Sequence, residues 1–562
     1  MQPDHHARPA ALAGMPLATA RWRAPHSQLF LPLKSFWFWT ALCIALFTLA
    51  PVAVIFTYVG APETDIWRHL KTTVLPEYIA NTLLLVVGVG LGTTLVGVSL
   101  AWLTAVCEFP GRRFFSWALM LPLALPAYVT GFVMIGLLDF TGPLQTVLRD
   151  SFGWSAFPPI RSGGGVVFVM TLALYPYVYL LARNAFLTQG RRALEVAQSL
   201  GLSRRQGFFR VALPMARPWI AGGAALVIME TLADFGTVAI FNYDTFTTGI
   251  YKAWFSLFSL PAAAQLASLL IVAVFLLLLV EQYSRSRMRF TATGRSSGQV
   301  RHALHGPSKW LAVCGCTTIW LLAFAVPVAA LAYWAWQVAA QDFDQRYVSY
   351  IVHSLLLGGL AAALCTWVAL WLSYAGRQQS SSAMRLTTRF ATLGYAVPGA
   401  VLAIGSYSLI AWFDNYYIYF MQAFGESRGP LLQGTIVAML AAYLARFLAV
   451  AHQPVEAAMQ RVTHNMEDAA RSLGLSSLPA LRRVHLPLMR GGILTAALLV
   501  FVDVMKEMPI TLMTRPFGWD TLATRIFEMT SEGEWQRAAL PAVSLVVAGL
   551  LPVLLLVKHS EK

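Results

Sequence analysis

The chain has 562 residues, of which 57% are hydrophobic and only 12% are charged, and its formal net charge is +15. A soluble domain carries about 25% charged residues, so this composition excludes a water-exposed globule of this length. The apolar residues gather in runs of roughly 18–25 residues, long enough to cross about 30 Å of hydrocarbon. The runs lack the alternation of an outer-membrane barrel, so the sequence predicts an all-α, polytopic membrane protein.

The chain begins with a polar, loosely basic tail (residues 1–35) and then becomes apolar. The stretch 36–59 is too long for the h-region of a signal peptide, so we interpret it as a retained span. The segment 284–309 is polar, basic and contains Gly and Ser, which predicts a linker between halves 36–283 and 310–562. Twelve segments are candidate spans: 36–59, 79–106, 114–138, 164–187, 213–241, 262–283, 310–337, 350–375, 388–413, 431–452, 489–514 and 537–557.

Lysine and arginine residues are distributed unequally between the two sides of these spans. With the N-terminus inside, the segments on that side hold 29 of them and the opposite segments hold 10. Cytoplasmic loops are enriched in these residues, so both termini and the linker are predicted to be cytoplasmic. The basic charge is thus a topology signal that also favours anionic lipid. No basic surface with stacking aromatics indicates nucleic-acid binding.

One polar segment occurs twice, at an offset of 273 residues (468 minus 195). Residues 195–214 read EVAQSLGLSRRQGFFRVALP and residues 468–487 read DAARSLGLSSLPALRRVHLP. Other parts of the two halves also match, such as Pro126 with Pro398. Because each half has six predicted spans, an even number, both halves enter the membrane in the same direction. The sequence therefore predicts two parallel six-helix repeats.

The twin segments resemble the EAA loops of type I ABC importer permeases, in which an acidic residue and two alanines precede a glycine and a Leu-Pro. Val196 replaces one alanine, and Asp468 replaces the glutamate. The resemblance implies the MetI-like fold, a place in the bacterial inner membrane, and docking of an ATPase at these loops. The residues that carry it are Glu195, Ala197, Gly201, Leu213 and Pro214 in the first copy and Asp468, Ala469, Ala470, Gly474, Leu486 and Pro487 in the second.

The residue types of the loop suit a docking role. Small alanines allow another protein to approach a short helix closely, a glycine allows a left-handed turn after it, and proline is tolerated in the first turn of the next span. The chain has no P-loop motif, so we expect no cofactor on this chain. The resemblance implies two copies of a cytoplasmic ABC ATPase, which bind ATP and magnesium, and a periplasmic binding protein as partners. Gly88, Gly90 and Gly92 lie in a span, where they are expected to allow close helix packing.

The segments 229–255 and 502–529 resemble the ferric-iron class of these permeases. Fused permeases for thiamine and for phosphonates share the architecture, so these substrates remain alternatives. A secondary transporter is a further alternative, which the twin loops argue against. A membrane enzyme would need a polar catalytic cluster, and neither a His-rich nor a Ser/His/Asp group is visible.

Several ionisable residues fall within predicted spans, and we single out Glu230, Asp234, Asp503, Lys506 and Glu507. The acids occupy matching positions of the two halves. Ionisable groups in a membrane are costly and face a cavity or pair with one another. Carboxylates would suit the passage of a hard, trivalent cation. In the alternative interpretation the acids anchor a gate and Lys506 neutralises one of them, and the sequence leaves both interpretations open.

Overall fold

The computed structural model describes residues 35–60, 65–154, 157–190, 197, 199, 201–286 and 302–560. Most of the predicted tail, most of the predicted linker and Glu195 lie outside the described residues. The elements of the first half are α1 (Phe36–Thr57), α2 (Asp65–His69), η3 (Leu70–Val74), α3 (Leu75–Val106), β1 (Cys107–Glu108), α4 (Arg112–Ala118), η4 (Leu121–Ala124), α5 (Ala127–Leu138), α6 (Pro143–Phe152), α7 (Gly163–Ala185), η5 (Phe186–Gly190), α9 (Arg204–Gly207), η6 (Phe208–Ala212), α10 (Leu213–Ala233), α11 (Gly236–Ile240), α12 (Phe246–Phe255) and α13 (Leu260–Ser286).

The elements of the second half follow a broadly similar order. They are β2 (His302–Ala303), α14 (Pro307–Trp320), η7 (Leu321–Ala325), α15 (Val326–Asp342), α16 (Gln345–Gln378), α17 (Ser382–Ala391), η8 (Leu393–Ala396), α18 (Gly399–Ala423), α19 (Ile436–Met459), α20 (His464–Ser472), α21 (Ser477–Ala480), η9 (Leu481–His485), α22 (Leu486–Leu488), α23 (Arg490–Lys506), α24 (Pro509–Thr514), α25 (Leu522–Ser531) and α26 (Trp535–Ser560).

Nine of the described helical segments are long and apolar enough to cross a membrane, or ten if the bent pair Leu481–Leu488 and Arg490–Lys506 is one span. The remaining two predicted spans coincide with α18 and α26, which do not reach that standard. The second half of α18 carries Asp414 and Asn415, and the side chains of α26 are described only over Trp535–Leu550. The prediction of a polytopic all-α protein is confirmed, and the number twelve stays a prediction.

The two halves pack their central helices in the same way. In the first half α3 contacts α7 and α10, and in the second half α16 contacts α19 and α23. A Cβ atom at Gly88 would lie 2.8 Å from Val167, and one at Gly92 would lie 2.6 Å from Thr171. These glycines therefore let α3 approach α7 closely, as the sequence predicted.

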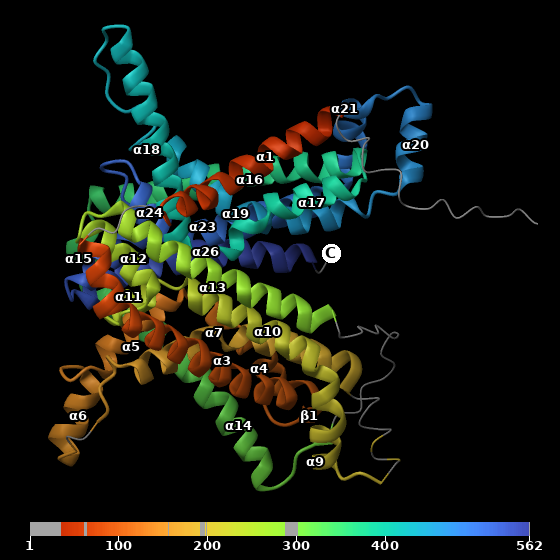
Figure 1. Cartoon of the computed structure of the whole chain (residues 1–562). Helices are drawn as coiled ribbons and strands as arrows, with labels where there is room; N and C mark the ends of the chain where they lie inside the picture. The colour runs from red at the N-terminus through yellow and green to blue at the C-terminus, as the bar shows by residue number, and fades with distance from the viewer. Residues whose placement is uncertain are drawn as a thin grey trace, which may run out of the picture.

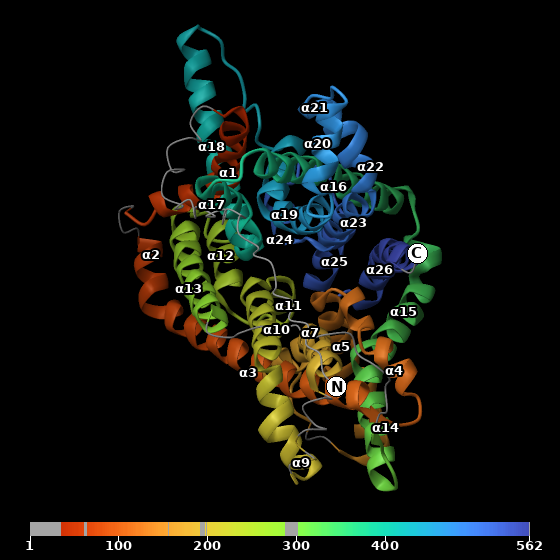
Figure 2. The ribbon, with the colours of Figure 1, turned by 90° about the vertical axis from the view of Figure 1, so that its right-hand side faces the viewer.

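The first span of each half packs on the other half. Helix α1 contacts α17 and α18 of the second half, while α14 contacts α4 of the first half and α15 contacts both α5 and α26. Figure 2 shows α1 among the helices of the second half. Strands β1 and β2 form a short parallel pair that joins Cys107 to His302 and Glu108 to Ala303. The end of the linker is therefore fixed to the first half.

Four predicted spans are interrupted, at equivalent places in the two halves. The backbone is extended at Leu125, before Pro126, and at Val397, before Pro398, because proline disfavours helical backbone in the residue before it. It is extended again at Asp234 and Glu507. The predictions of continuous spans over 114–138, 213–241, 388–413 and 489–514 were wrong in this respect, because each span consists of separate helices with a break between them.

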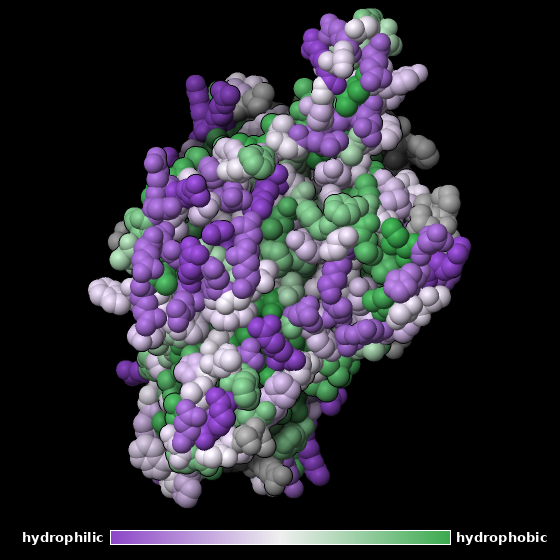
Figure 3. All heavy atoms as spheres, turned by 90° about the vertical axis from the view of Figure 1, so that its left-hand side faces the viewer, coloured by the Kyte–Doolittle hydropathy of each residue, from purple (hydrophilic) through white to green (hydrophobic). Residues whose placement is uncertain are grey.

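The repeated loops lie at one end of the molecule, where α9, α20 and α21 are found in Figure 1. The opposite end, which Figure 3 shows, carries many hydrophilic side chains. Ion pairs near this end include Arg161–Asp139 at 3.1 Å and Arg537–Asp342 at 2.9 Å. Both ends of the bundle thus carry charge, as expected of a protein whose ends meet water.

Candidate functional site

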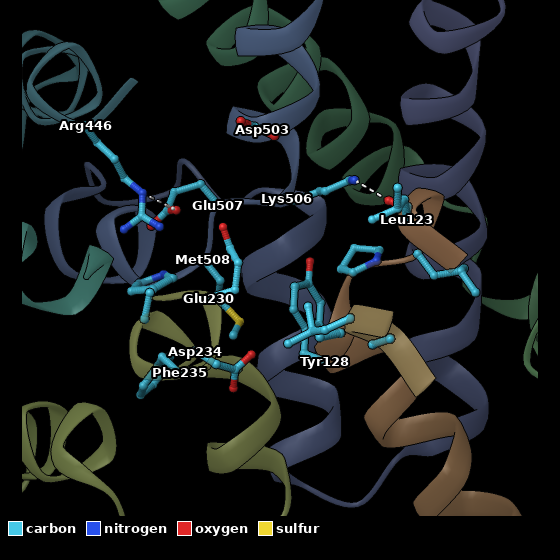
Figure 4. A pocket seen from close by; sticks show the side chains of 18 of the residues that line it. Leu123, Tyr128, Glu230, Asp234, Phe235, Arg446, Asp503, Lys506, Glu507 and Met508 are labelled. Carbon is cyan, nitrogen blue, oxygen red and sulfur yellow. Dashed lines mark hydrogen bonds and ion pairs between the residues drawn. The ribbon is translucent and has the colours of Figure 1, made fainter. Parts of the chain in front are cut away.

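A cavity of about 190 Å³ lies where the breaks of the two halves meet. It is lined from the first half by Pro126, Tyr128 and the end of α10, and from the second half by Arg446 on α19 and the end of α23. Figure 4 shows acidic side chains entering it from both halves. A Cβ atom at Gly236 would lie 2.5 Å from the Met508 methyl carbon, so the two halves touch beside the cavity.

Asp234 accepts hydrogen bonds from the helix that follows the first break. Its Oδ1 accepts from the amides of Thr237 and Val238, at 3.0 and 3.2 Å, and its Oδ2 accepts from the Thr237 hydroxyl at 2.9 Å. A carboxylate at this position satisfies amides that the helix leaves unpaired. Asp234 therefore holds the start of α11.

Glu507 has the same role in the second half. Its Oε1 accepts from the Ile510 amide at 3.0 Å, at the start of α24, and its Oε2 lies 3.4 Å from Nε of Arg446. Gly399 makes room for this pair, since a Cβ atom there would lie 2.3 Å from an Arg446 nitrogen. For Asp234 and Glu507, the geometry agrees with the alternative interpretation, in which the predicted acids anchor a gate.

Glu230 and Asp503 are different, although they too occupy matching positions. Each lies one helical turn before the end of its helix, α10 or α23, and lines the cavity. Within the part of the chain that the structure describes, no hydrogen bond or ion pair satisfies either carboxylate. Of the predicted acids, these two are therefore the ones available to a passing cation.

Two cations, both from the second half, face these acids. Lys506 donates a hydrogen bond of 3.0 Å to the Leu123 carbonyl of the first half, which links the halves across the cavity (Figure 4). Arg446 was not singled out from the sequence, although it lies within the predicted span 431–452, where the cost of an intramembrane charge could have drawn attention to it. Its Nε and Nη1 are buried, and among the described residues they have no hydrogen-bond acceptor beyond the ion pair of Nε with Glu507. The Tyr128 hydroxyl is likewise buried without a partner among these residues.

The cavity thus combines four carboxylates with two cations and unpaired donors. Among the described residues, no group of three His, Cys, Asp or Glu side chains converges as a metal site would require. The arrangement therefore offers a polar, net acidic constriction between the halves, without the closed ligand set of a storage site.

The glycines of the repeated loops adopt the predicted left-handed conformation. Gly201 has a φ of +81° and Gly474 has a φ of +83°. In both copies the following leucine amide bonds back to the alanine carbonyl, from Leu202 to Ala197 at 3.0 Å and from Leu475 to Ala470 at 3.1 Å. Each loop therefore has a glycine turn at this place, and in the second copy the turn closes the short helix α20.

The acidic residue that contacts the rest of the chain is Glu467, whereas the predicted Asp468 is exposed. Glu467 Oε1 lies 2.6 Å from Nε of Arg377 and 3.0 Å from Nε2 of His485. Arg377 also donates to the Met459 carbonyl at 2.9 Å. This buried group holds α20 against α16, the end of α19 and η9.

The predicted alanines and prolines show two further features. Ala197 and Ala470 are buried against the chain itself, so only Ala469 of the second pair faces outward. Pro214 lies in the first turn of α10, as predicted. Pro487 instead lies in the three-residue α22, and a bend of 68° separates that segment from α23. The prediction that Leu486 and Pro487 directly begin the span was therefore wrong.

The fold and the site define a duplicated membrane transport component with a polar constriction between its halves. Two stretches, 94–290 and 366–562, match the family model for the binding-protein-dependent transport system inner membrane component. The chain therefore belongs to this family of multi-pass permease subunits, which act together with a binding protein and a separate ATPase.

Several curated relatives are similar to the chain over much of its length. The Fe(3+)-transport system permease protein FbpB 2 of Haemophilus influenzae is 29% identical over 536 residues, which cover 93% of this chain and 99% of that protein. The ferric transport system permease protein FbpB of Actinobacillus pleuropneumoniae is 22% identical and covers 92% of this chain and 76% of its own. The molybdenum transport system permease protein ModB of Escherichia coli is 29% identical over 33% of this chain.

Proposed function

We propose that this chain is the fused transmembrane subunit of an ABC importer for ferric iron. A periplasmic binding protein delivers the iron, and two copies of a cytoplasmic ATPase dock beneath the two glycine-closed loops. The termini and the repeated loops lie in the cytoplasm. The chain itself binds no cofactor, and ATP and magnesium bind to the ATPase subunits.

The observation that carries the proposal is the pair Glu230 and Asp503, which the two halves present to one cavity without a partner. Hard cations prefer oxygen ligands, so two such carboxylates suit the passage of ferric iron. The end-to-end similarity to a ferric permease supports the same substrate. The molybdenum relative supports it less, because it covers only a third of the chain.

The geometry also supports a way of coupling. Along the chain the first repeated loop is followed by α10, and the second is followed, after the 68° bend, by α23. The far ends of these two helices carry Glu230 and Asp503. Movement of the docked ATPases would therefore tilt these two helices and part or close the contact between Gly236 and Met508. Asp234 and Glu507 would keep the short helices α11 and α24 attached through that movement.

Uptake of radiolabelled ferric iron tests the proposal. Cells that express the chain with its ATPase and binding protein are compared with cells that lack only this chain. We expect iron uptake to be lost without the chain and lost again when the ATPase is inactivated. Unchanged iron uptake would contradict the ferric substrate and leave family membership intact, and thiamine and phosphonates would then be measured in the same cells.

A further inference from the structure

A second, apolar cavity of about 370 Å³ lies between α1, α18 and α19 (residues Phe36–Thr57, Gly399–Ala423 and Ile436–Met459). Helices α1 and α18 cross at Gly405, where a Cβ atom would lie 2.0 Å from the Pro51 carbonyl oxygen. Beyond this contact the space between them is bordered on the α19 side by Ala438, Ala441 and Ala442. The small side chains leave it unfilled.

The cavity is continuous with the apolar outer surface of the bundle. Its lining includes Phe47, Trp412, Phe413 and Val437, all of which are exposed, the tryptophan and the valine to 65% each. In a protein that spans a membrane, such a surface contacts lipid tails and not water. Ala441 lies five residues from the outer end of α19, so at about 1.5 Å per residue the cavity is near the membrane edge.

Two polar groups in this apolar surrounding are left without partners in their own helices. Ser406 lines the cavity, is 3% exposed, and its hydroxyl has no hydrogen-bond partner among the residues that the structure describes. Pro51 has no amide hydrogen, so the carbonyl of Phe47 lacks its usual helical donor. A purely hydrocarbon occupant would leave the Ser406 hydroxyl unsatisfied, whereas an occupant with an ester carbonyl could accept its hydrogen.

Hydrogen bonds hold the chain segment that lies at the outer side of the cavity. Asp414 is fully buried, and its carboxylate accepts hydrogen bonds from the amides of Leu431, Leu432 and Gln433 at 2.7–3.1 Å. This fixes the returning chain over the cavity. Figures 1 and 2 both show α18 extending sideways beyond the bundle, and its far part exposes aromatic side chains, including Tyr419 at 73%. Aromatic residues of this kind gather at the headgroup level of a membrane.

We propose that this cavity binds one acyl chain of a phospholipid from the leaflet opposite the coupling loops, with the lipid's ester carbonyl accepting a hydrogen bond from Ser406. The chain lies along Ala438, Ala441 and Ala442, and the extended part of α18 lies over the headgroup. In the first half the corresponding place is taken by α5, which ends at Leu138, and by α6, which also projects from the bundle (Figure 1). The apolar cavity described above lies beside α18, at its contact with α1. The bound lipid therefore belongs to the α1–α18 contact, where the first span of one half packs on the other half.

Photolabelling of the full-length protein in phospholipid vesicles tests this site. The probe is a phosphatidylethanolamine with a photoactivatable group near the ester of one acyl chain, and labelled peptides are identified by mass spectrometry. We expect labelling concentrated on 406–413 and 437–442, and loss of that labelling in Ala441→Trp, whose indole fills the cavity. Leu95→Trp on the exposed face of α3 is the control and should change nothing.

Ser406→Ala keeps the cavity open and tests the hydrogen bond separately from folding. With it, labelling by the phospholipid should fall to the level given by a photoactivatable alkane, which has no ester. Equal labelling of the cavity and of the surface around Leu95 in the unaltered protein would overturn the proposal. Equal labelling by the phospholipid and the alkane before any substitution would overturn the ester contact.

Discussion

At the scale of single residues, the acidic side chains at matching positions of the two halves fall into two kinds. Asp234 and Glu507 satisfy the first amides of short helices, while Glu230 and Asp503, four positions earlier in each half, face the cavity without partners. Sequence spacing predicted both matching pairs but could not separate them. The difference depends on which carboxylate meets a helix start, and that follows from backbone breaks.

The two acidic pairs should therefore respond differently to neutral replacement. In the double variant Glu230→Gln with Asp503→Asn, we expect the initial rate of ferric uptake to fall at least about tenfold, equivalent to about 1.4 kcal/mol. Asp234→Asn is the matched control, because asparagine also caps helices, and it should retain most uptake. Normal uptake by the double variant at normal protein amount would contradict a role for these carboxylates in the path.

Substitution of the loop glycines tests coupling to the ATPase separately from folding of this chain. Among the described residues, no atom lies within 4 Å of a Cβ atom placed at Gly201 or Gly474, although both glycines have positive φ. We expect Gly201→Asp with Gly474→Asp to abolish uptake while the protein stays in the membrane. The control is Gly425→Asp with Gly533→Asp, since both glycines have positive φ and equally open surroundings but lie away from the coupling loops. Uptake that survives the first double variant would contradict the coupling role.

At the scale of elements, the two repeated loops differ in the contacts of their helices with the rest of the chain. The second is held by the buried contacts of Glu467 with Arg377 and His485. At the offset of the repeat, Arg377 and His485 correspond to Thr104 and Ala212, so the first half lacks these charges. Thr104 instead lies 3.0 Å from the Tyr179 hydroxyl. The two loops therefore have similar sequences, but the buried charged contacts of the second have no counterpart at these positions of the first half.

Removal of one partner of the buried group should loosen α20. We expect Arg377→Met to destabilise the protein by about 3–5 kcal/mol, because Glu467 would remain buried with less compensation. Thermal unfolding in detergent measures this, and ATP hydrolysis stimulated by the binding protein measures coupling. Arg385→Met changes an exposed arginine on the neighbouring α17 and should have little effect on either. Equal stability of the two variants would show that the buried group does not support the loop.

At the scale of the whole molecule, the halves defined by sequence are not separate bodies. Helix α1 packs on the second half, α14 packs on the first, and Lys506 bonds to the Leu123 carbonyl across the cavity. The linker is thus not the main connection between the halves. Because the first span of each half packs on the other half, each half has an apolar contact with the other.

Cutting the linker should therefore leave the halves together. With a protease site placed within 287–301, we expect both fragments to copurify through a tag on one of them. Gly405→Val should weaken the association, because a side chain there meets the Pro51 carbonyl at 2.0 Å. Gly359→Val, at a glycine with open surroundings, is the matched control. Separation of the unaltered fragments after cleavage would contradict this picture.

The sequence by itself determined the class of protein, the duplication and the loop glycines. Hydropathy and charge act locally, so runs of apolar residues, basic loops and a repeated segment can be read without knowledge of long-range contacts. The left-handed turns at Gly201 and Gly474 are likewise local, because the conformation depends on the residue itself.

Only the tertiary structure decided what depends on contacts between distant residues. It brought Arg446 to Glu507 and Glu467 to Arg377, interrupted four spans that looked continuous, and placed α1 on the opposite half. A carboxylate's role is set by the amides, cations and space around it, and these come from helices far apart in the chain. The path between the halves is therefore a property of how the repeats pack, which neither repeat carries alone.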